Sequence, residues 1–289
     1  MDFEKKLNGI LNKVNKDNLL NIKKFNEINK IPENDFIKKA YRFPRQGVFK
    51  DTITIIPLSD IHLGSRQCNK KKLQMAVDLI LETENCYTVL LGDQTETATK
   101  VSVGMGTYDE DMPTEQQVAE IIKILRPLAD KGKILGILDG NHEMRVRYAT
   151  SLNIVKMIAE TLGIDYFGFQ GYISVHVGKQ VYHIFAHHGV SGGTTPAGKL
   201  NGMRKFRNVA DADLYISGHT HGKMHDSDVL MGIDDVANKV VPIVKHYAVC
   251  GSFLEYWDGY SEMKALPPSA TGVMAIILNA DEKRIDFID

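Results

Sequence analysis

The sequence is poor in cysteine and has no long apolar run. Its three cysteines, Cys68, Cys86 and Cys250, are an odd number without paired spacing. They are predicted to be buried or free thiols in a reducing compartment, which excludes a disulfide framework. No apolar run approaches the roughly 18 to 20 residues of a membrane helix. The first residues, MDFEKKLNGI, carry charges where a signal peptide has an apolar region. The sequence therefore predicts a cytoplasmic protein without a membrane partner.

Net charge is also nearly absent. The formal charge of the 289 residues is -1, which neither indicates nor excludes a polyanionic partner for the whole chain. However, residues 1–45 contain 11 Lys and Arg against 6 Asp and Glu. Apolar residues at helical spacing, among them Phe3, Leu7 and Leu11, predict helices in this stretch. We therefore expect a basic, helical appendage at residues 1–47 and a main domain at residues 48–289.

The appendage has two interpretations. Its cations could neutralise the phosphates of DNA or RNA and localise the protein on a nucleic acid. The six interspersed acids instead favour charged helix faces that are exposed to solvent. In that case the appendage would pack on the main domain or mediate homo-oligomerisation.

From Thr52 onward, short apolar strands run into polar or glycine-containing clusters. Strands are expected at 53–58, 87–91, 134–138, 181–186 and 214–217, and helices at 70–84, 114–131 and 151–162. Thr114 with Gln117 predicts a capping box. The alternation indicates an α/β protein with a largely parallel central sheet. The tail, 240–251 and 272–289, is expected to complete a second sheet. Ligands of such sheets gather at the carboxyl ends of the strands.

The polar residues at these strand ends are of the types that bind metal ions. Buried together without a cation, two carboxylates would repel and the imidazoles would lack acceptors. Carboxylate with imidazole suits borderline metals, and the set has no thiolate. The spacing in Asp60-x-His62 and in His219-x-His221 directs two side chains the same way as a strand ends. The candidate metal ligands are Asp60, His62, Asp93, Asn141, His187, His219 and His221.

Each motif alone has an ordinary interpretation, such as a turn with a surface histidine or a helix N-cap. The five motifs together are much more specific than any one alone, because they follow five predicted apolar strands in order. The segments are Asp60-Ile61-His62, Gly92-Asp93, Gly140-Asn141-His142-Glu143, His187-His188 and Gly218-His219-Thr220-His221. With this order, the chain resembles the calcineurin-like metallophosphoesterase superfamily, in its phage- and bacterium-encoded branch.

The resemblance implies a double β-sandwich flanked by helices, with residues 48–289 as the catalytic domain. It also implies two metal ions about 3.5–4 Å apart around a water-derived hydroxide. Carried onto matching positions, Asp60, His62 and His221 would hold one ion. Asn141, His187 and His219 would hold the other, with Asp93 bridging. Manganese is expected, with iron, zinc, nickel or cobalt as alternatives.

Three further residues are candidates for substrate contacts. His142 resembles the family residue that contacts phosphate or protonates the leaving group. In the histidine doublet, His187 is chosen as the ligand because it is expected to be the first residue beyond its strand. His188 remains the alternative and a candidate for substrate binding, as do Asn141 and Arg145. Arg147 and Lys199 are weaker candidates.

The flanking residues favour a diester substrate. Phosphoprotein phosphatases of this superfamily carry arginines beside the second and third motifs, and this chain has Thr97 and Asp139 at those places. We therefore expect a phosphodiesterase or nuclease acting on a nucleic acid or nucleotide. A phosphomonoesterase, or a nucleic-acid-binding or scaffold protein with a metal site, remains an alternative.

Overall fold

The computed structural model describes Ile28 and residues 38–99, 102, 106–190 and 193–289. The chain divides into two compact units, residues 1–39 and 40–289. The predicted helical appendage lies almost entirely outside the described residues. The second unit begins at Ala40 rather than at residue 48, because Tyr41–Phe43 forms strand β1 and pairs with the first sheet of that unit.

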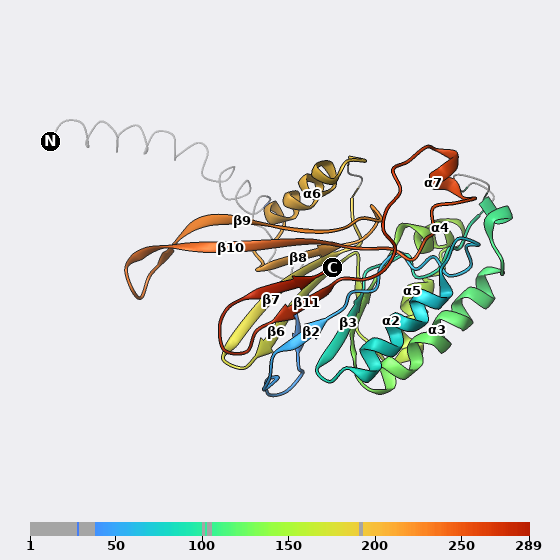
Figure 1. Cartoon of the computed structure of the whole chain (residues 1–289). Helices are drawn as coiled ribbons and strands as arrows, with labels where there is room; N and C mark the ends of the chain where they lie inside the picture. Colours follow the sequence, from blue (N-terminus) through green and yellow to red (C-terminus); the bar gives the residue numbers. More distant parts are fainter. Residues whose placement is uncertain (1–27, 29–37, 100–101, 103–105, 191–192) are drawn as a thin grey trace, which may run out of the picture. The chain divides into compact units, whose positions relative to one another are not determined.

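The first sheet of this unit has six strands in the order β1-β6-β7-β8-β10-β9 (Figure 1). Their bounds are Gln170–Val177 for β6, Gln180–His187 for β7, Leu214–Ser217 for β8, Lys223–Asp234 for β9 and Lys239–Cys250 for β10. The pairs β1/β6, β7/β8 and β8/β10 are parallel, whereas β6/β7 and β9/β10 are antiparallel. The sheet is therefore mixed rather than largely parallel.

The second sheet also has six strands, in the order β12-β11-β2-β3-β4-β5. Its strands are β2 Ile53–Ile55, β3 Cys86–Leu90, β4 Ile134–Leu138, β5 Tyr166–Gly168, β11 Ala275–Leu278 and β12 Ile285–Ile288. β2 to β5 are parallel, and β11 is antiparallel to both neighbours. The expectation that the whole tail completes one sheet was wrong, since β10 joins the first sheet and β11 and β12 join the second.

Helices cover the outer faces of both sheets, which makes four layers. α2 (Lys70–Glu82), α3 (Thr114–Asp130) and α5 (Ile154–Leu162) pack with residues of β3 and β4, such as Leu90 and Ile137, in one apolar cluster. α6 (Pro196–Arg204) and a 3-10 turn at Lys205–Asn208 pack on Phe185, Tyr215 and Tyr247 of the first sheet. A third cluster, with Val89, Ile184 and Ile216, lies between the sheets. The double β-sandwich flanked by helices is confirmed.

The capping-box prediction for α3 was wrong. The N-cap residue is Pro113, with no side-chain cap bond. Gln117 is buried and instead holds the loop after the second motif: its Oε1 accepts from Thr97 N at 2.9 Å, and its Nε2 donates to Glu110 Oε1 at 2.7 Å. A residue at the right spacing for a cap therefore serves a tertiary contact.

The three cysteines are free and buried, as predicted. Among the residues that the structure describes, no helix is both long and apolar enough to cross a membrane.

The sandwich brings the polar clusters to one place. β2, β3 and β4 of the second sheet lead into Asp60, Asp93 and Asn141, and β7 and β8 of the first sheet lead into His188 and His219. The site is therefore assembled from both sheets at the carboxyl ends of their strands, where α/β proteins place ligands.

Candidate metal centre

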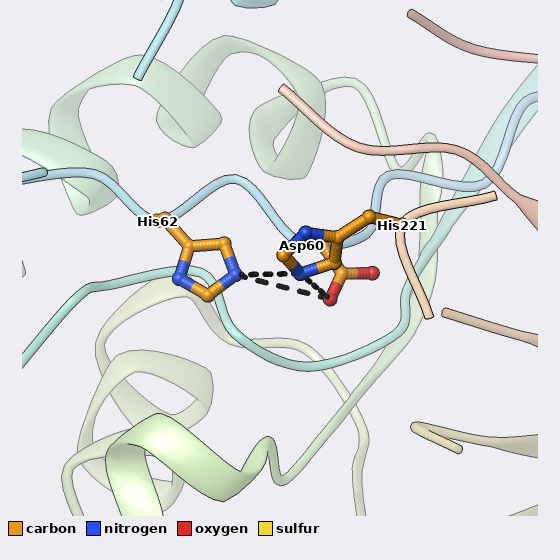
Figure 2. Close-up of side chains that lie close together, drawn as sticks. All are labelled: Asp60, His62 and His221. Atoms are coloured by element: carbon orange, nitrogen blue, oxygen red, sulfur yellow. Dashed lines mark hydrogen bonds and ion pairs between the residues drawn. The ribbon is translucent and has the colours of Figure 1, made fainter. Parts of the chain in front are cut away.

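Asp60, His62 and His221 form the first group of converging donors (Figure 2). Oδ1 of Asp60 lies 3.3 Å from Nε2 of His221 and 3.9 Å from Nε2 of His62. The two Nε2 atoms lie 3.3 Å from each other. Two imidazole nitrogens and one carboxylate oxygen that face a common point are a suitable ligand set for a divalent cation.

Asp93, His188 and His219 form a second group, completed by Asn141. The side-chain oxygen of Asn141 lies 2.9 Å from His188 Nε2 and 2.9 Å from His219 Nδ1. Oδ2 of Asp93 lies 3.2 Å from His188 Nε2. An amide oxygen between two imidazoles and next to a carboxylate again offers converging lone pairs.

Asp93 lies between the two groups. Its Oδ2 is 3.2 Å from His188 of the second group and 3.7 Å from His62 of the first. Its other oxygen, Oδ1, accepts a hydrogen bond from the backbone N–H of His142 at 2.9 Å. This position matches the bridging role that the family resemblance implies.

His187 does not reach this centre, and His188 takes its place. His187 is the last residue of β7, and its ring lies 5.0 Å from that of Phe206 in a tilted arrangement, against the helical layer. Side chains alternate along a strand, so His188 points with Ala186 toward the other side. The prediction failed because β7 ends one residue later than expected, at His187, which makes His188 the first residue beyond it.

The backbone at the candidate ligands is unusual. Five of them have a positive φ: Asp60 (49°), His62 (50°), Asp93 (52°), His219 (66°) and His221 (50°). Non-glycine residues rarely adopt this left-handed region, and such strain concentrates at functional sites. The side chains of Asp60-x-His62 and His219-x-His221 therefore converge through left-handed turns, and not through the strand alternation that we expected.

At two glycines of the motifs, neighbouring atoms lie so close to the backbone that no side chain fits. A Cβ at Gly140 would lie 2.0 Å from Asp93 N and 2.2 Å from Asp93 Oδ1. A Cβ at Gly218 would lie 1.7 Å from Ser59 Oγ and 2.3 Å from Asp60 Oδ2. Any side chain at either position would displace a carboxylate of the centre.

Opposite charges at the centre shift the pKa values of its members. Burial by itself would raise the pKa of Asp60, but the charge and hydrogen bond of His221 hold it well below its ordinary value. Burial would likewise lower the pKa of His188, but the charge of Asp93 and its hydrogen bond raise it to about 9. Both carboxylates are ionised, and protonated His188 compensates the charge of Asp93. A divalent cation would supply the same compensation and release the protons.

His219 behaves differently. Its pKa is lowered, first by burial and then by the charge of His188. It is therefore neutral near pH 7 and ready to act as a ligand.

Glu96 is a functional residue that the sequence analysis missed. Its Oε2 lies 2.9 Å from His62 Nδ1, and its Oε1 lies 3.2 Å from His142 Nδ1. Burial would raise the pKa of Glu96, but its hydrogen bonds with His142 and His62 lower it below the ordinary range. The sequence did contain one signal for this residue: Glu96 is a carboxylate only three residues after Asp93, in the segment that follows β3.

His142 and Arg145 lie together at the start of α4 (Asn141–Thr150). His142 Nδ1 also faces the backbone oxygen of Glu96 at 2.9 Å, and its Nε2 faces Asp93 Oδ2 at 3.9 Å. Arg145 Nη2 lies 2.9 Å from His142 Nε2. Both side chains border the centre. Arg147, in contrast, lies 3.8 Å from Asp139 Oδ2 and does not line the cavities at the centre.

Glu143 binds the backbone of the second motif. It is buried, and it accepts hydrogen bonds from Asp93 N at 3.2 Å and Thr95 N at 2.9 Å. Burial and the charge of Asp93 raise its pKa. Its contacts fix the turn that presents Asp93.

Two cavities adjoin the centre. One of about 350 Å³ is lined by His62, Asp93, His142 and Arg145, among others. The other, of about 270 Å³, is lined by Lys199, Thr220 and Tyr256, among others. His219 and His221 line both.

The packed sheets bring together, at their strand ends, carboxylate–imidazole clusters that could hold metal ions. The sequence model of the family described as "Calcineurin-like phosphoesterase" matches residues 53–223, more than half of the chain. The chain belongs to this family, and the predicted resemblance is confirmed.

Comparison with curated proteins gave no significant match. Among solved structures, zinc-bound Vps29 from Entamoeba histolytica is 12% identical, with a TM-score of 0.40 and coverage of 82% of this chain and 97% of that one. A metallophosphoesterase from Sphaerobacter thermophilus is 15% identical, with a TM-score of 0.37 and coverage of 81% and 86%. A predicted phosphoesterase from Streptococcus pneumoniae is 11% identical, with a TM-score of 0.35 and coverage of 82% and 89%.

Proposed function

We propose that this protein is a dinuclear metal-dependent phosphodiesterase that acts on a nucleic acid or a nucleotide. The observation that carries the proposal is that two cavities, of about 350 and 270 Å³, share the imidazoles of His219 and His221. A phosphodiester carries a substituent on each of two ester oxygens. Each substituent would have a cavity of its own beside the reacting phosphate, whereas a monoester would use only one.

The donor set fits two divalent cations. Asp60, His62 and His221 would hold one, and Asn141, His188 and His219 the other, with Asp93 shared between them. The support is the chemistry of the set. In the first group, two imidazole nitrogens lie 3.3 and 3.9 Å from Asp60 Oδ1, and in the second, two lie 2.9 Å from the Asn141 oxygen. Manganese is the proposed metal, with iron, zinc, nickel or cobalt as alternatives. When bound, the cations would stabilise charge on the phosphoryl oxygens and lower the pKa of a water.

The residues of the larger cavity have separate roles. Glu96 accepts from Nδ1 of His142, which leaves Nε2 directed at the centre. From there His142 would contact the phosphoryl group and, when both ring nitrogens carry a proton, transfer the Nε2 proton to the leaving oxygen. Arg145, 2.9 Å from the same Nε2, would hold a phosphoryl oxygen through its guanidinium.

The test compares hydrolysis of bis(p-nitrophenyl) phosphate with that of p-nitrophenyl phosphate by the manganese-loaded protein. We expect a higher kcat/KM for the diester, and a further screen over cyclic nucleotides and single- and double-stranded nucleic acid then narrows the substrate. Faster cleavage of the monoester would overturn the diesterase proposal. Full activity in an Asp93→Asn, His142→Ala double variant would show that the reaction occurs elsewhere.

A further inference from the structure

The smaller cavity beside the metal centre is lined by a lysine that forms no ion pair with any residue the structure describes. Lys199 of α6 is half-buried, and its Nζ has one polar contact among the described residues, Ser269 Oγ at 3.5 Å. Burial lowers its pKa, and no neighbouring acid opposes this shift. Glu255, the one acid among the described residues that line the cavity, is engaged by Asn69 Nδ2 at 2.6 Å and by Lys72 Nζ at 3.3 Å.

The ammonium group is close to the segment that carries two candidate ligands. A Cβ at Gly222 would lie 3.2 Å from Lys199 Cδ and 3.5 Å from its Nζ. Gly222 directly follows His221, so the lysine stem lies against the backbone at the end of the fifth motif. Lys199 therefore lies beside the end of the fifth motif, at the edge of the centre.

Thr220 is a second residue with a polar side chain at this cavity. Thr220 stands between His219 and His221 and lines the same cavity. Its Oγ1 is buried and has no hydrogen-bond partner within the part of the chain that the structure describes. A buried hydroxyl left unpaired costs about 1–3 kcal/mol.

The walls of the cavity suit a nucleoside. Leu254, Tyr256, Leu266 and Pro267 offer apolar and aromatic surface. Aromatic side chains stack on nucleic-acid bases, and lysines neutralise phosphates. A volume of about 270 Å³ is at the low end for small-molecule sites, so it fits one unit of a strand and not a duplex.

We infer that Lys199 marks a subsite for a second phosphate of the substrate, separated from the reacting phosphate by one nucleoside, as in a polynucleotide strand. The inference rests on the proposed phosphodiesterase function. His142 and Arg145 line only the larger cavity, so the leaving group lies there. The smaller cavity then receives the nucleoside that stays attached to the reacting phosphate, and Lys199 pairs with the next phosphate along the strand.

The experiment uses two chromogenic diesters, thymidine 5′-(p-nitrophenyl phosphate) and the same compound with a 3′-phosphate. We expect the wild-type protein to prefer the 3′-phosphorylated compound in kcat/KM. Lys199→Ala should reduce this preference ~10- to 100-fold, the range of a charge-assisted hydrogen bond, and Lys199→Arg should retain most of it. Lys205→Ala, at an exposed lysine just beyond α6, is the matched control and should keep the wild-type preference.

A preference that is the same in Lys199→Ala as in the wild type would overturn the subsite, as would an equal fall for both diesters. Calorimetry with thymidine 3′,5′-bisphosphate against thymidine 5′-monophosphate provides a reading that needs no turnover. If neither diester is cleaved but Lys199→Ala weakens only the bisphosphate, the subsite stands and the proposed activity fails. A larger loss for thymidine 5′-diphosphate than for the bisphosphate would overturn the strand assignment in favour of a polyphosphate.

Discussion

Oε2 of Glu96 lies 2.9 Å from Nδ1 of His62, on the ring side opposite the nitrogen that faces Asp60 and His221. The other carboxylate oxygen lies 3.2 Å from Nδ1 of His142. One side chain thus orients a proposed metal ligand and the proposed acid. Carboxylates behind ligating histidines fix the ring and raise its basicity.

Replacing Glu96 by Gln should therefore impair both functions. We expect manganese affinity and kcat each to fall ~10- to 100-fold, because the carboxylate that fixes both rings is lost. Steady-state kinetics over pH and metal titration measure the two effects separately. Glu115→Gln, at an exposed glutamate of α3, is the control. A loss of thermal stability with normal metal affinity and an unchanged pH profile would mean that Glu96 only supports the fold.

Two variants distinguish the roles of His187 and His188 in metal binding. His188→Ala should remove one of two bound manganese ions and most of the activity, because its Nε2 faces both Asp93 and Asn141. His187→Ala should keep both ions, since its ring packs on Phe206 instead. Elemental analysis of the purified variants gives the metal content. The reverse pattern would restore the assignment made from the sequence.

Asp93→Asn tests the shared ligand. The amide retains the shape of the carboxylate but removes the charge that lies between both groups. We expect metal content to fall below two ions per chain and kcat to fall at least ~100-fold. Asp281→Asn, at an exposed aspartate, should match the wild type in both respects. Two retained ions with full activity would exclude a bridging role for Asp93.

The stabilisation by manganese should depend on pH. The pKa of His188 is raised to about 9, against about 6.5 for an unperturbed histidine. The ion pair of protonated His188 with Asp93 therefore stabilises the metal-free protein fully below pH ~6.5, and this contribution is lost as pH rises through about 9. A cation needs the neutral imidazole and replaces the lost charge.

The difference in Tm between protein with manganese and protein with chelator should thus increase from pH 6.5 to 9. Differential scanning fluorimetry across this range measures it. In His188→Gln the increase should be smaller, because the titrating group is absent. A Tm difference that is constant or declines over this range would contradict the charge assignment of the centre.

The sequence by itself determined the class of the fold and most of the centre. Apolar strands that run into Asp60, Asp93, Asn141 and His219 can be recognised from local pattern alone, because the strand and its terminal polar residue are adjacent in the chain. The carboxyl ends of parallel strands then meet at one edge for geometric reasons. The residue types, carboxylate and imidazole, further indicated a cation.

Only the tertiary structure decided which side chains face the centre and what holds them there. The choice between His187 and His188 depends on one residue of strand length, since neighbouring side chains point to opposite faces. Glu96 acts on His142, 46 positions away, and Gln117 binds the loop at Thr97 instead of capping its helix. Such partners come from packing between distant segments. Local sequence carries the chemistry of each group, whereas distances between groups exist only once both sheets are packed together.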